Sequence, residues 1–171
     1  ARMRVIPALV MVAAALTGCA GMQPVPESEK TVIKVIETPG QSKDKIYNAT
    51  RVWFSESFKS SKAVIDLEDK EQGIIIGKGN TKFPCQGFDC MSKADWRLKF
   101  TMRVDMKDEK MRITFNDIGV AWPSSYSGGI ASPSYDGPIN TIGDMQKAKP
   151  ELERIADSLA ASIANPAKSD W

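Results

Sequence analysis

The fold is decided by residues 95–107, which read DWRLKFTMRVDMK. Every even position of this stretch carries a large apolar side chain, and every odd position carries a charged or hydroxyl side chain. Successive side chains of a strand point to opposite faces, so this strict period of two predicts a half-buried β-strand. The alternation resumes over residues 111–115 after a polar turn at 108–109, which predicts an antiparallel hairpin.

The chain before this hairpin predicts a strand and then a helix. A β-branched run over residues 31–37 is typical of a strand, and it stops at Pro39-Gly40. Ser42 is placed to cap a helix, because its hydroxyl can accept from a free backbone N–H of the first turn. Apolar side chains at helical spacing then predict one amphipathic helix over residues 43–59.

Two more strands and a second helix complete the predicted elements. Residues 63–68 and 73–83 predict strands, and the Ser, Gly and Pro content of 122–143 predicts a long loop. Apolar residues spaced from Leu152 to Ile163 predict a final amphipathic helix that starts near Pro150. The fold class is therefore α+β in the order β-α-β4-α, an antiparallel sheet of about five strands with two helices packed on one face.

The first nineteen residues resemble the signal of a bacterial lipoprotein. Two arginines precede an apolar run over residues 5–16, which is too short to span a bilayer, and Leu16-Thr17-Gly18-Cys19 follows. This resemblance implies cleavage after residue 18 and lipid attachment at Cys19, whereas the plainer alternative is a secretory signal with an incidental cysteine. Ala20 in place of Asp implies the outer membrane, on its periplasmic or surface face.

The predicted organisation is a signal peptide at 1–18, a lipidated Cys19 with a Pro-rich tether to residue 30, and one domain over 31–171. Cleavage would leave 171 − 18 = 153 residues, which is enough for one domain with a hydrophobic core. It would also remove two arginines, leaving 23 − 2 = 21 basic residues against 21 acidic residues. A global charge for binding polyanions is therefore absent.

The chain contains no histidine, which removes the commonest general base and the commonest metal ligand. We therefore expect no catalytic residue, no metal and no cofactor. The remaining two cysteines, Cys85 and Cys90, are expected to form a disulfide across a small loop in an oxidising compartment. A metal site and a redox pair are the alternatives; the first lacks ligands, and the second normally has two intervening residues.

Most of residues 31–171 resembles the bacterial DUF4468 family. The resemblance is carried by residues 35–44, 53–54, 58–65 and 69–79, and by the ending at 169–171. It is best between residues 35 and 79, and the loop at 85–90 looks like an addition. The resemblance implies a fold like that of the TATA-binding protein and a secreted lipoprotein, and it supplies no catalytic residues.

Two surfaces are candidates for binding. The outward face of the central hairpin carries a basic set: Arg97, Lys99, Arg103, Lys107, Lys110 and Arg112. Antiparallel sheets commonly leave one face to water, so this set predicts first a solvated face. If the face binds a partner, we expect phosphorylated lipopolysaccharide, anionic lipid or an acidic protein, and no nucleic acid in an exported lipoprotein.

The second candidate surface is the predicted loop, which carries Trp122, Tyr126 and Tyr135 together with two isoleucines. Aromatic rings on a Ser, Gly and Pro frame can anchor in a pocket of a protein or glycan. The alternative is that the loop folds back and that Trp122 closes the end of the core.

The sequence thus predicts a lipid-anchored, non-catalytic domain that binds another envelope component, either a protein or a glycan. Its membrane contact would come from the lipid anchor. The alternative is a small-ligand or lipid-binding domain with a cavity between sheet and helix, lined by Trp53, Trp96, Phe100 and Met102. Those four residues can equally form a packed core.

Overall fold

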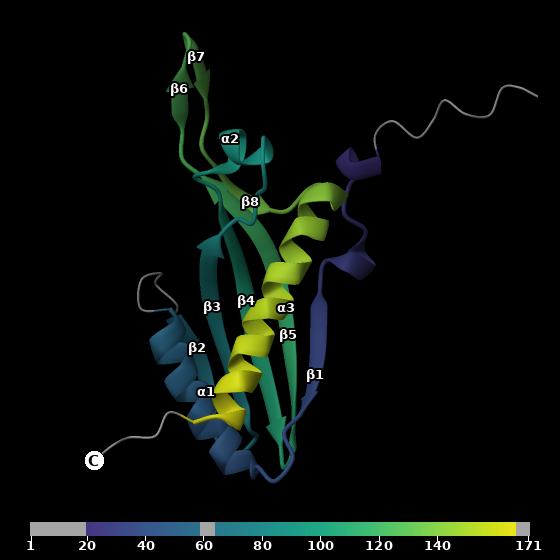
Figure 1. Cartoon of the computed structure of the whole chain (residues 1–171), viewed down its shortest axis with the longest axis vertical. Helices are drawn as coiled ribbons and strands as arrows, with labels where there is room; N and C mark the ends of the chain where they lie inside the picture. The colour runs from purple at the N-terminus through teal and green to yellow at the C-terminus, as the bar shows by residue number, and fades with distance from the viewer. Residues whose placement is uncertain (1–19, 59–63, 167–171) are drawn as a thin grey trace, which may run out of the picture.

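The computed structural model describes residues 20–58 and 64–166 (Figure 1). The predicted signal peptide, the predicted lipidation site Cys19 and the family-like ending at 169–171 lie outside the described residues. Within the described part of the chain, no helix combines the length and the hydrophobicity that crossing a bilayer requires.

The main sheet has six antiparallel strands. They are β1 (Val32–Glu37), β2 (Val64–Asp69), β3 (Ile74–Lys82), β4 (Arg97–Lys107), β5 (Lys110–Trp122) and β8 (Tyr135–Pro138). The spatial order is β1-β5-β4-β3-β2, and β8 pairs with the last four residues of β5, beyond the end of β1. The α+β class with a predominantly antiparallel sheet is therefore confirmed, with one strand more than the five expected.

The predicted central hairpin is confirmed by the pairing of β4 with β5. Met106 lies opposite Met111 next to the turn, and Met102 lies opposite Phe115. The even-numbered residues of β4 are buried and face the helices, whereas the odd-numbered ones lie on the open face. Gly79 on β3 faces the same core, where an added Cβ would come within 2.8 Å of the Phe100 ring. The core is therefore a tightly packed layer between sheet and helices.

Two helices cover one face of the sheet, as Figure 1 shows for α1 (Lys43–Ser57) and α3 (Ile142–Ala164). The Ser42 hydroxyl accepts from the backbone N–H of Lys45 at 3.4 Å, so the predicted N-cap is confirmed. The apolar stripe of α1, including Ile46 and Phe54, is buried against the sheet and α3. The expectation of two helices on one face is also confirmed.

The start of α3 was predicted wrongly. The helix begins at Ile142, eight residues before Pro150, which lies inside it. Thr141 is the N-cap, and its hydroxyl accepts from the backbone N–H of Asp144 at 3.3 Å. Met145 and Ala148 continue the buried stripe upstream of the proline. Proline removes one intrahelical donor, and here the burial of the extra turns outweighs that loss.

The returning strand β5 extends beyond residues 111–115, whose alternation predicted it. A β-bulge interrupts the alternation after that point. Asp117 has a φ of 48°, and the pairing with β4 shifts register between Lys99 and Thr101. The extra residue changes which positions face the core. Before the bulge these are odd-numbered residues such as Phe115, and after it they are the even-numbered Ile118 and Val120. A period-two pattern therefore ends at residue 115, whereas the strand continues to Trp122.

The predicted long loop at 122–143 is largely β-structure. A two-stranded hairpin of β6 (Ser125–Ser127) and β7 (Ile130–Ser132) projects from one end of the molecule (Figure 1), and β8 follows. Gly128 and Gly129 form its two-residue turn with φ values of 58° and 85°. Such turns favour glycine, because both central residues have positive φ. The composition that predicted a loop is thus the composition of a tight hairpin.

The segment expected to be an extended tether lies against the domain. Two short 3-10 helices, η1 (Ala20–Met22) and η2 (Glu27–Glu29), flank a stretch in which Val25 is buried. The backbone N–H of Ile142 donates to the Gln23 carbonyl at 2.9 Å, so η1 lies beside the first turn of α3. The described chain therefore begins at the end of the molecule where α3 starts.

A candidate binding cleft and an apolar end

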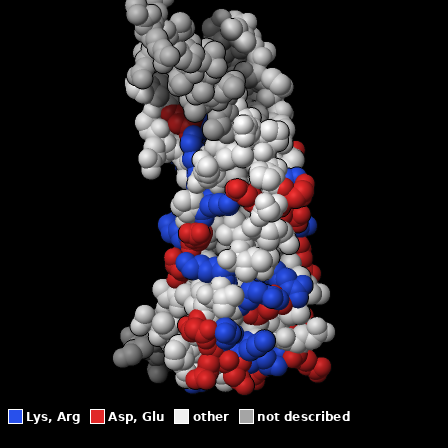
Figure 2. All heavy atoms as spheres, turned by 90° about the vertical axis from the view of Figure 1, so that its right-hand side faces the viewer, with Lys and Arg blue, Asp and Glu red and all other residues white. Residues whose placement is uncertain are grey.

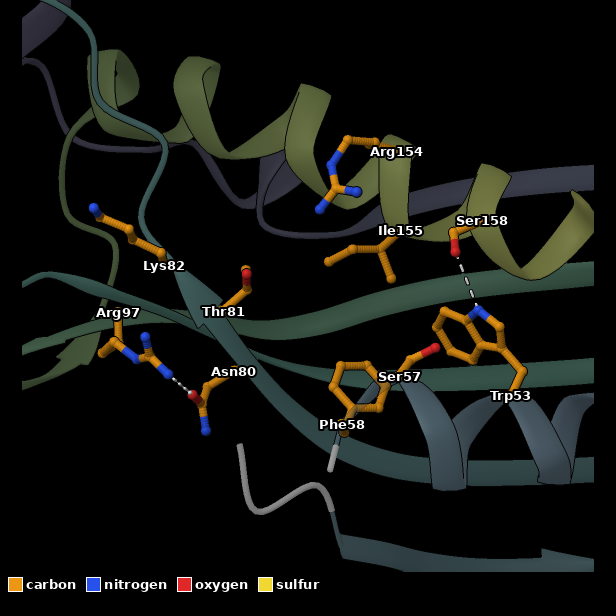
Figure 3. Close-up of a pocket in the computed structure, with 10 residues that line it drawn as sticks. All are labelled: Trp53, Ser57, Phe58, Asn80, Thr81, Lys82, Arg97, Arg154, Ile155 and Ser158. Atoms are coloured by element: carbon orange, nitrogen blue, oxygen red, sulfur yellow. Dashed lines mark hydrogen bonds between the residues drawn. The ribbon is translucent and has the colours of Figure 1, made fainter. Parts of the chain in front are cut away.

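An open cleft lies where β3 and α3 continue past the end of α1 (Figure 3). Its volume is about 470 Å³. The lining side chains come from four elements: Trp53, Ser57 and Phe58 at the end of α1, Asn80, Thr81 and Lys82 on β3, Arg97 on β4, and Arg154, Ile155 and Ser158 on α3. The cleft exists because α1 is shorter than the sheet that it covers.

The inner wall of the cleft is apolar and rigid. The rings of Trp53 and Phe58 meet edge to face with centroids 5.5 Å apart. The Trp53 Nε1–H donates to the Ser158 hydroxyl at 3.2 Å, which ties α1 to α3 across the back of the cleft. Ile155 completes this wall. A buried, hydrogen-bonded tryptophan fixes the shape of the cleft without depending on a ligand.

The rim of the cleft is basic. Arg97 donates from Nη2 to the Asn80 amide oxygen at 3.1 Å, so it is positioned without being neutralised. Arg154 pairs with Glu151 through two hydrogen bonds of 2.6 and 2.9 Å, and these bonds raise the pKa of the Arg154 guanidinium. Lys82 forms no salt bridge within the described residues. Two cations without an acidic partner among the described residues, Lys82 and Arg97, lie beside hydroxyl and amide groups, and this combination favours an anionic, hydroxyl-rich ligand.

The space between sheet and helix is filled by side chains. Three residues that the sequence placed around a possible cavity, Trp53, Phe100 and Met102, are at most 5% exposed and belong to the core. The fourth, Trp96, packs against that core. The cleft thus lies at the edge of this layer and shares Trp53 with it.

The expected disulfide joins Cys85 and Cys90, whose Cα atoms are 5.0 Å apart. Cys90 belongs to a short helix, α2 (Asp89–Lys93), which the sequence pattern did not predict. Lys93 pairs with Asp89 and with Asp144 of α3, and Lys147 of α3 pairs with Asp89 at 2.7 Å. These ion pairs hold the disulfide loop on the start of α3.

The ion pairs shift the pKa values of Asp89 and Lys93. Hydrogen bonding to Lys147, assisted by Lys93, lowers the pKa of the Asp89 carboxyl below its usual value. Burial by itself would lower the pKa of Lys93, but the hydrogen bonds to Asp144 and Asp89 outweigh it and the pKa of Lys93 is raised. The Lys93 ammonium also lies 4.9 Å from the centroid of the Trp96 ring. The Asp89 carboxyl and the Lys93 ammonium therefore both stay charged at neutral pH.

The three aromatic residues of the predicted binding loop separate into two groups. Trp122 stacks between Trp96 and Tyr135, with ring centroids 4.2 and 4.5 Å away. Its Nε1–H donates to the Pro133 carbonyl, and the Tyr135 hydroxyl donates to the Pro138 carbonyl at 2.8 Å. These rings close the end of the core, which was the alternative for Trp122. Tyr126 on β6 is instead 77% exposed.

Other large apolar side chains are exposed at the same end as Tyr126. We call this set the apolar end: Met22 on η1, Phe88 in the disulfide loop, Met91 on the adjoining α2, and Tyr126 and Ile130 on the β6–β7 hairpin. Their exposed fractions lie between 72% and 89%. Of this set, Tyr126 and Ile130 belong to the loop that the sequence offered as a contact surface, and the other three were not predicted. The signal for the others is a large apolar side chain in a short Gly- or Pro-containing segment without helical or strand periodicity.

The basic set on the open face of the central hairpin is neutralised more completely than the sequence predicted. Lys99 pairs with Asp136 of β8, and Lys110 pairs with Glu37 of β1. Arg103 and Arg112 both contact Asp105, at 2.8 and 3.4 Å. Figure 2, which looks onto the side of the molecule where β1 forms the edge of the sheet, shows basic and acidic side chains interleaved over its lower part. Arg97 is the member of this set that lines the cleft.

Asp105 is the centre of that charge cluster. The hydrogen bond from Arg103 lowers the pKa of its carboxyl, and Arg112 adds to the effect. The same bond raises the pKa of Arg103. An ion pair of this kind is expected on a solvated sheet face, and it leaves little uncompensated charge for a polyanion.

No metal site emerges from the described residues. No group of three or more His, Cys, Asp or Glu side chains in that part of the chain is placed to hold a metal ion. The polar groups of the cleft are amides, hydroxyls and cations, which can bind and orient a ligand.

Two solved structures have a fold similar to that of this chain. A TBP-like protein from Parabacteroides distasonis superposes with a TM-score of 0.61 at 17% identity, covering 83% of this chain and 97% of that one. A DUF4468 family protein from Bacteroides ovatus superposes with a TM-score of 0.55 at 16% identity, covering 86% of this chain and 93% of that one. At such identities the likeness shows the fold alone. No curated protein sequence gives a significant match.

The family model for the domain of unknown function with a TBP-like fold matches residues 33–121. The match runs from β1 to the last strand of the central hairpin and covers more than half of the 171 residues. The disulfide loop lies inside the matched range, whereas the β6–β7 hairpin and α3 follow it. On this match and on the shared fold, the chain belongs to the DUF4468 family.

Proposed function

We propose that this protein is a lipid-anchored envelope protein whose domain is non-catalytic and binds an acidic glycan of the cell envelope in the cleft between α1 and α3. The observation that carries the proposal is the basic rim of the cleft, where Lys82, Arg97 and Arg154 line the same opening as hydroxyl and amide groups. Glycans present many hydroxyls, and envelope glycans often carry phosphate or carboxylate groups.

The chemistry of the rim supports a glycan over an apolar ligand. Hydroxyls of Ser57, Thr81 and Ser158 line the cleft beside the side-chain amide of Asn80. Such groups can donate to and accept from sugar hydroxyls, and the cations add charge-assisted bonds to an anionic substituent. The nearest large rings, Trp53 and Phe58, are buried at the back of the cleft. They limit its depth, so the ligand would lie along the rim.

The anchor part of the proposal rests on Leu16-Thr17-Gly18-Cys19 and on the location it implies. A protein held at the outer membrane is surrounded by phosphorylated lipopolysaccharide or other acidic polymers. Several acyl chains give stable anchoring, because each buried methylene contributes about 0.8 kcal/mol. The cleft would then face a high local concentration of its ligand.

A small anionic ligand is the second candidate, because the cleft volume of about 470 Å³ is also suited to a single small molecule. The same cations would bind its phosphate or carboxylate. A glycan differs from it by needing the hydroxyl groups of the rim as well. The two candidates therefore predict different competition by inorganic phosphate.

The test is calorimetric titration of the lipidated protein with phosphorylated core oligosaccharide from lipopolysaccharide, at low and at physiological salt. Arg97→Ala and Lys82→Ala are each expected to weaken binding about tenfold, since a charge-assisted hydrogen bond contributes about 1.5–3 kcal/mol. Higher salt should weaken binding by the wild type. Inorganic phosphate should compete poorly with a glycan and fully with a small anion.

The matched control is Lys45→Ala, which removes an exposed cation from the first turn of α1, at the opposite end of the helix from the cleft. It should leave affinity within about twofold of wild type, as for a surface charge far from the ligand. An equal loss in the control and in Arg97→Ala would show binding to general surface charge. Absence of heat with every probe would remove the cleft as the site. The intact mass of the protein reports the lipid on Cys19 independently.

A further inference from the structure

We propose that the apolar end is a membrane-docking surface, which lies on the same bilayer that the lipid on Cys19 enters. This inference rests on the lipid anchor proposed above and assigns a second, separate surface. It concerns Met22, Phe88, Met91, Tyr126 and Ile130, none of which lines the cleft.

The apolar end is assembled from three segments that are far apart in the sequence. η1, the disulfide loop with α2, and the β6–β7 hairpin all lie at the end of the molecule where α3 begins (Figure 1). Each of them exposes one or two large apolar side chains. Single exposed apolar residues are ordinary on a protein surface, whereas a set gathered at one end marks a contact.

The same segments are almost free of charge. Residues 20–26 and 123–135 contain no Asp, Glu, Lys or Arg. In α2, the charges of Asp89 and Lys93 are paired with Lys147 and Asp144 of α3. Because these pairs lie against α3, the disulfide loop presents Phe88 and Met91 outward. A surface that enters the headgroup region has this distribution, with apolar and aromatic side chains and few charges.

The path of the backbone identifies a bilayer as the occupant. Ala20 belongs to η1, and η1 is held beside the first turn of α3 by the bond from the Ile142 N–H to the Gln23 carbonyl. Cys19 immediately precedes Ala20 in the chain, and the Cα atoms of consecutive residues are about 3.8 Å apart. A lipid on Cys19 would therefore enter the membrane without a spacer, at the end of the domain that carries the exposed apolar side chains.

The supports of the apolar end are rigid. Trp122 stacks between Trp96 and Tyr135 at the base of the hairpin, and the disulfide closes the neighbouring loop. A fixed projection loses little conformational freedom on insertion, so each buried side chain contributes more to binding. With this end on the bilayer, α1 lies toward the opposite end of the molecule (Figure 1), and the cleft that its last residues line would lie away from the bilayer.

The experiment is photolabelling of the full lipidated protein in vesicles of phosphatidylethanolamine and phosphatidylglycerol that contain a diazirine lipid. Labelled residues are mapped by mass spectrometry, and the intact mass reports the lipid on Cys19. We expect peptides that contain residues 123–135 and 86–91 to be labelled about tenfold more than the peptide of α1, because only inserted side chains reach the lipid carbene. The variant with Tyr126→Asp and Ile130→Asp should lose the hairpin label while its circular dichroism is unchanged.

The matched control is Val52→Asp, which places a charge at an exposed apolar position on α1. It should leave the labelling pattern unchanged. A protein that carries the lipid on Cys19, but is labelled equally on the hairpin and on α1, would overturn the docking surface and leave the anchor standing. An unmodified Cys19 would overturn both. Cross-linking of the hairpin to a protein in intact cells would assign the apolar end to a protein partner instead.

Discussion

Two consecutive hairpins, β4–β5 and β6–β7, use opposite means to hold their shape. In β4–β5, one face is buried against two helices, and Val104 and Ile113 lie opposite each other without exposure to solvent. In β6–β7, all six strand residues are exposed. The first hairpin is thus held by the hydrophobic core, whereas the second has no core of its own.

The difference in burial between the two hairpins separates residues that fold the domain from residues that folding does not require. An isolated two-stranded hairpin is marginally stable in water, so β6–β7 depends on the Trp122 stack and on the pairing of β8 with β5. The core would close without residues 125–132, since Trp122 and Tyr135 already meet at their base. An exposed tyrosine and isoleucine on such a projection contribute little to folding. Their exposure is the feature that the proposed membrane-docking surface would use.

The largest effect should come from removing a side chain at the centre of the first hairpin. Phe115 is fully buried and meets the Phe100 ring edge to face at 5.5 Å. Phe115→Ala should lower the free energy of unfolding by about 3–5 kcal/mol, through lost burial and the cavity left behind. Urea denaturation followed by fluorescence measures this change. A loss below 1 kcal/mol would show that the core does not hold β4–β5.

A smaller effect should come from opening the link that closes the loop beside the second hairpin. Replacing both Cys85 and Cys90 by Ser should lower the free energy of unfolding by about 2 kcal/mol, because the unfolded chain gains freedom when a short loop is opened. Hydrogen exchange should show lost protection in α2. Wild type under reducing conditions should match the double variant. Unchanged protection in both would show that the ion pairs of Lys93 suffice.

The sequence predicted the parts of the fold in which one pattern acts alone. Residues 95–107 keep a strict alternation, so the strand, its buried face and its partner follow from it. The bulge at Asp117 shifts that alternation by one residue, and local periodicity cannot anticipate where a partner strand will tolerate a bulge. At α3, the capping pair Thr141 and Asp144 competes with Pro150 as a start signal, and tertiary burial decides between them.

The sequence singled out some residues of the cleft, but it did not predict that they lie together in one site. Arg97 was expected on a basic strand face and Trp53 in a core or cavity, and both line the cleft. Lys82 and Arg154 were not singled out, because they lie on β3 and α3 and only the tertiary fold brings them together. Exposed apolar residues such as Phe88 and Met91 were missed for the same reason.

The outer face of the first hairpin should contribute less than its core face. Asp105→Asn removes the carboxylate shared by Arg103 and Arg112, and we expect a loss of about 0.5–1 kcal/mol at neutral pH. The folded-state pKa of Asp105 is lowered, so the stabilisation is present above the unfolded pKa of about 3.9 and is lost as pH falls through the lower folded value. The difference between wild type and variant should therefore shrink below about pH 4.

Denaturation of both proteins between neutral and acidic pH tests this sign. Asp66→Asn is the matched control, because its carboxylate lies 3.3 Å from a single partner, the Lys78 ammonium, on an edge strand. It should cost less at neutral pH than Asp105→Asn. A difference that grows toward low pH would mean that the Asp105 pairs do not stabilise the folded state.

The smallest effect on the free energy of unfolding should come from a substitution in the second hairpin, β6–β7. Tyr126→Ala should change the free energy of unfolding by less than about 0.5 kcal/mol, as for a surface position without packed neighbours. Urea denaturation of the protein in detergent measures it beside Phe115→Ala. A loss above 1 kcal/mol would show that Tyr126 packs in the folded state, and its exposure would no longer indicate a contact surface. A neutral result combined with reduced photolabelling from the vesicle would separate folding from docking at this residue, because the side chain would then act only where lipid is present.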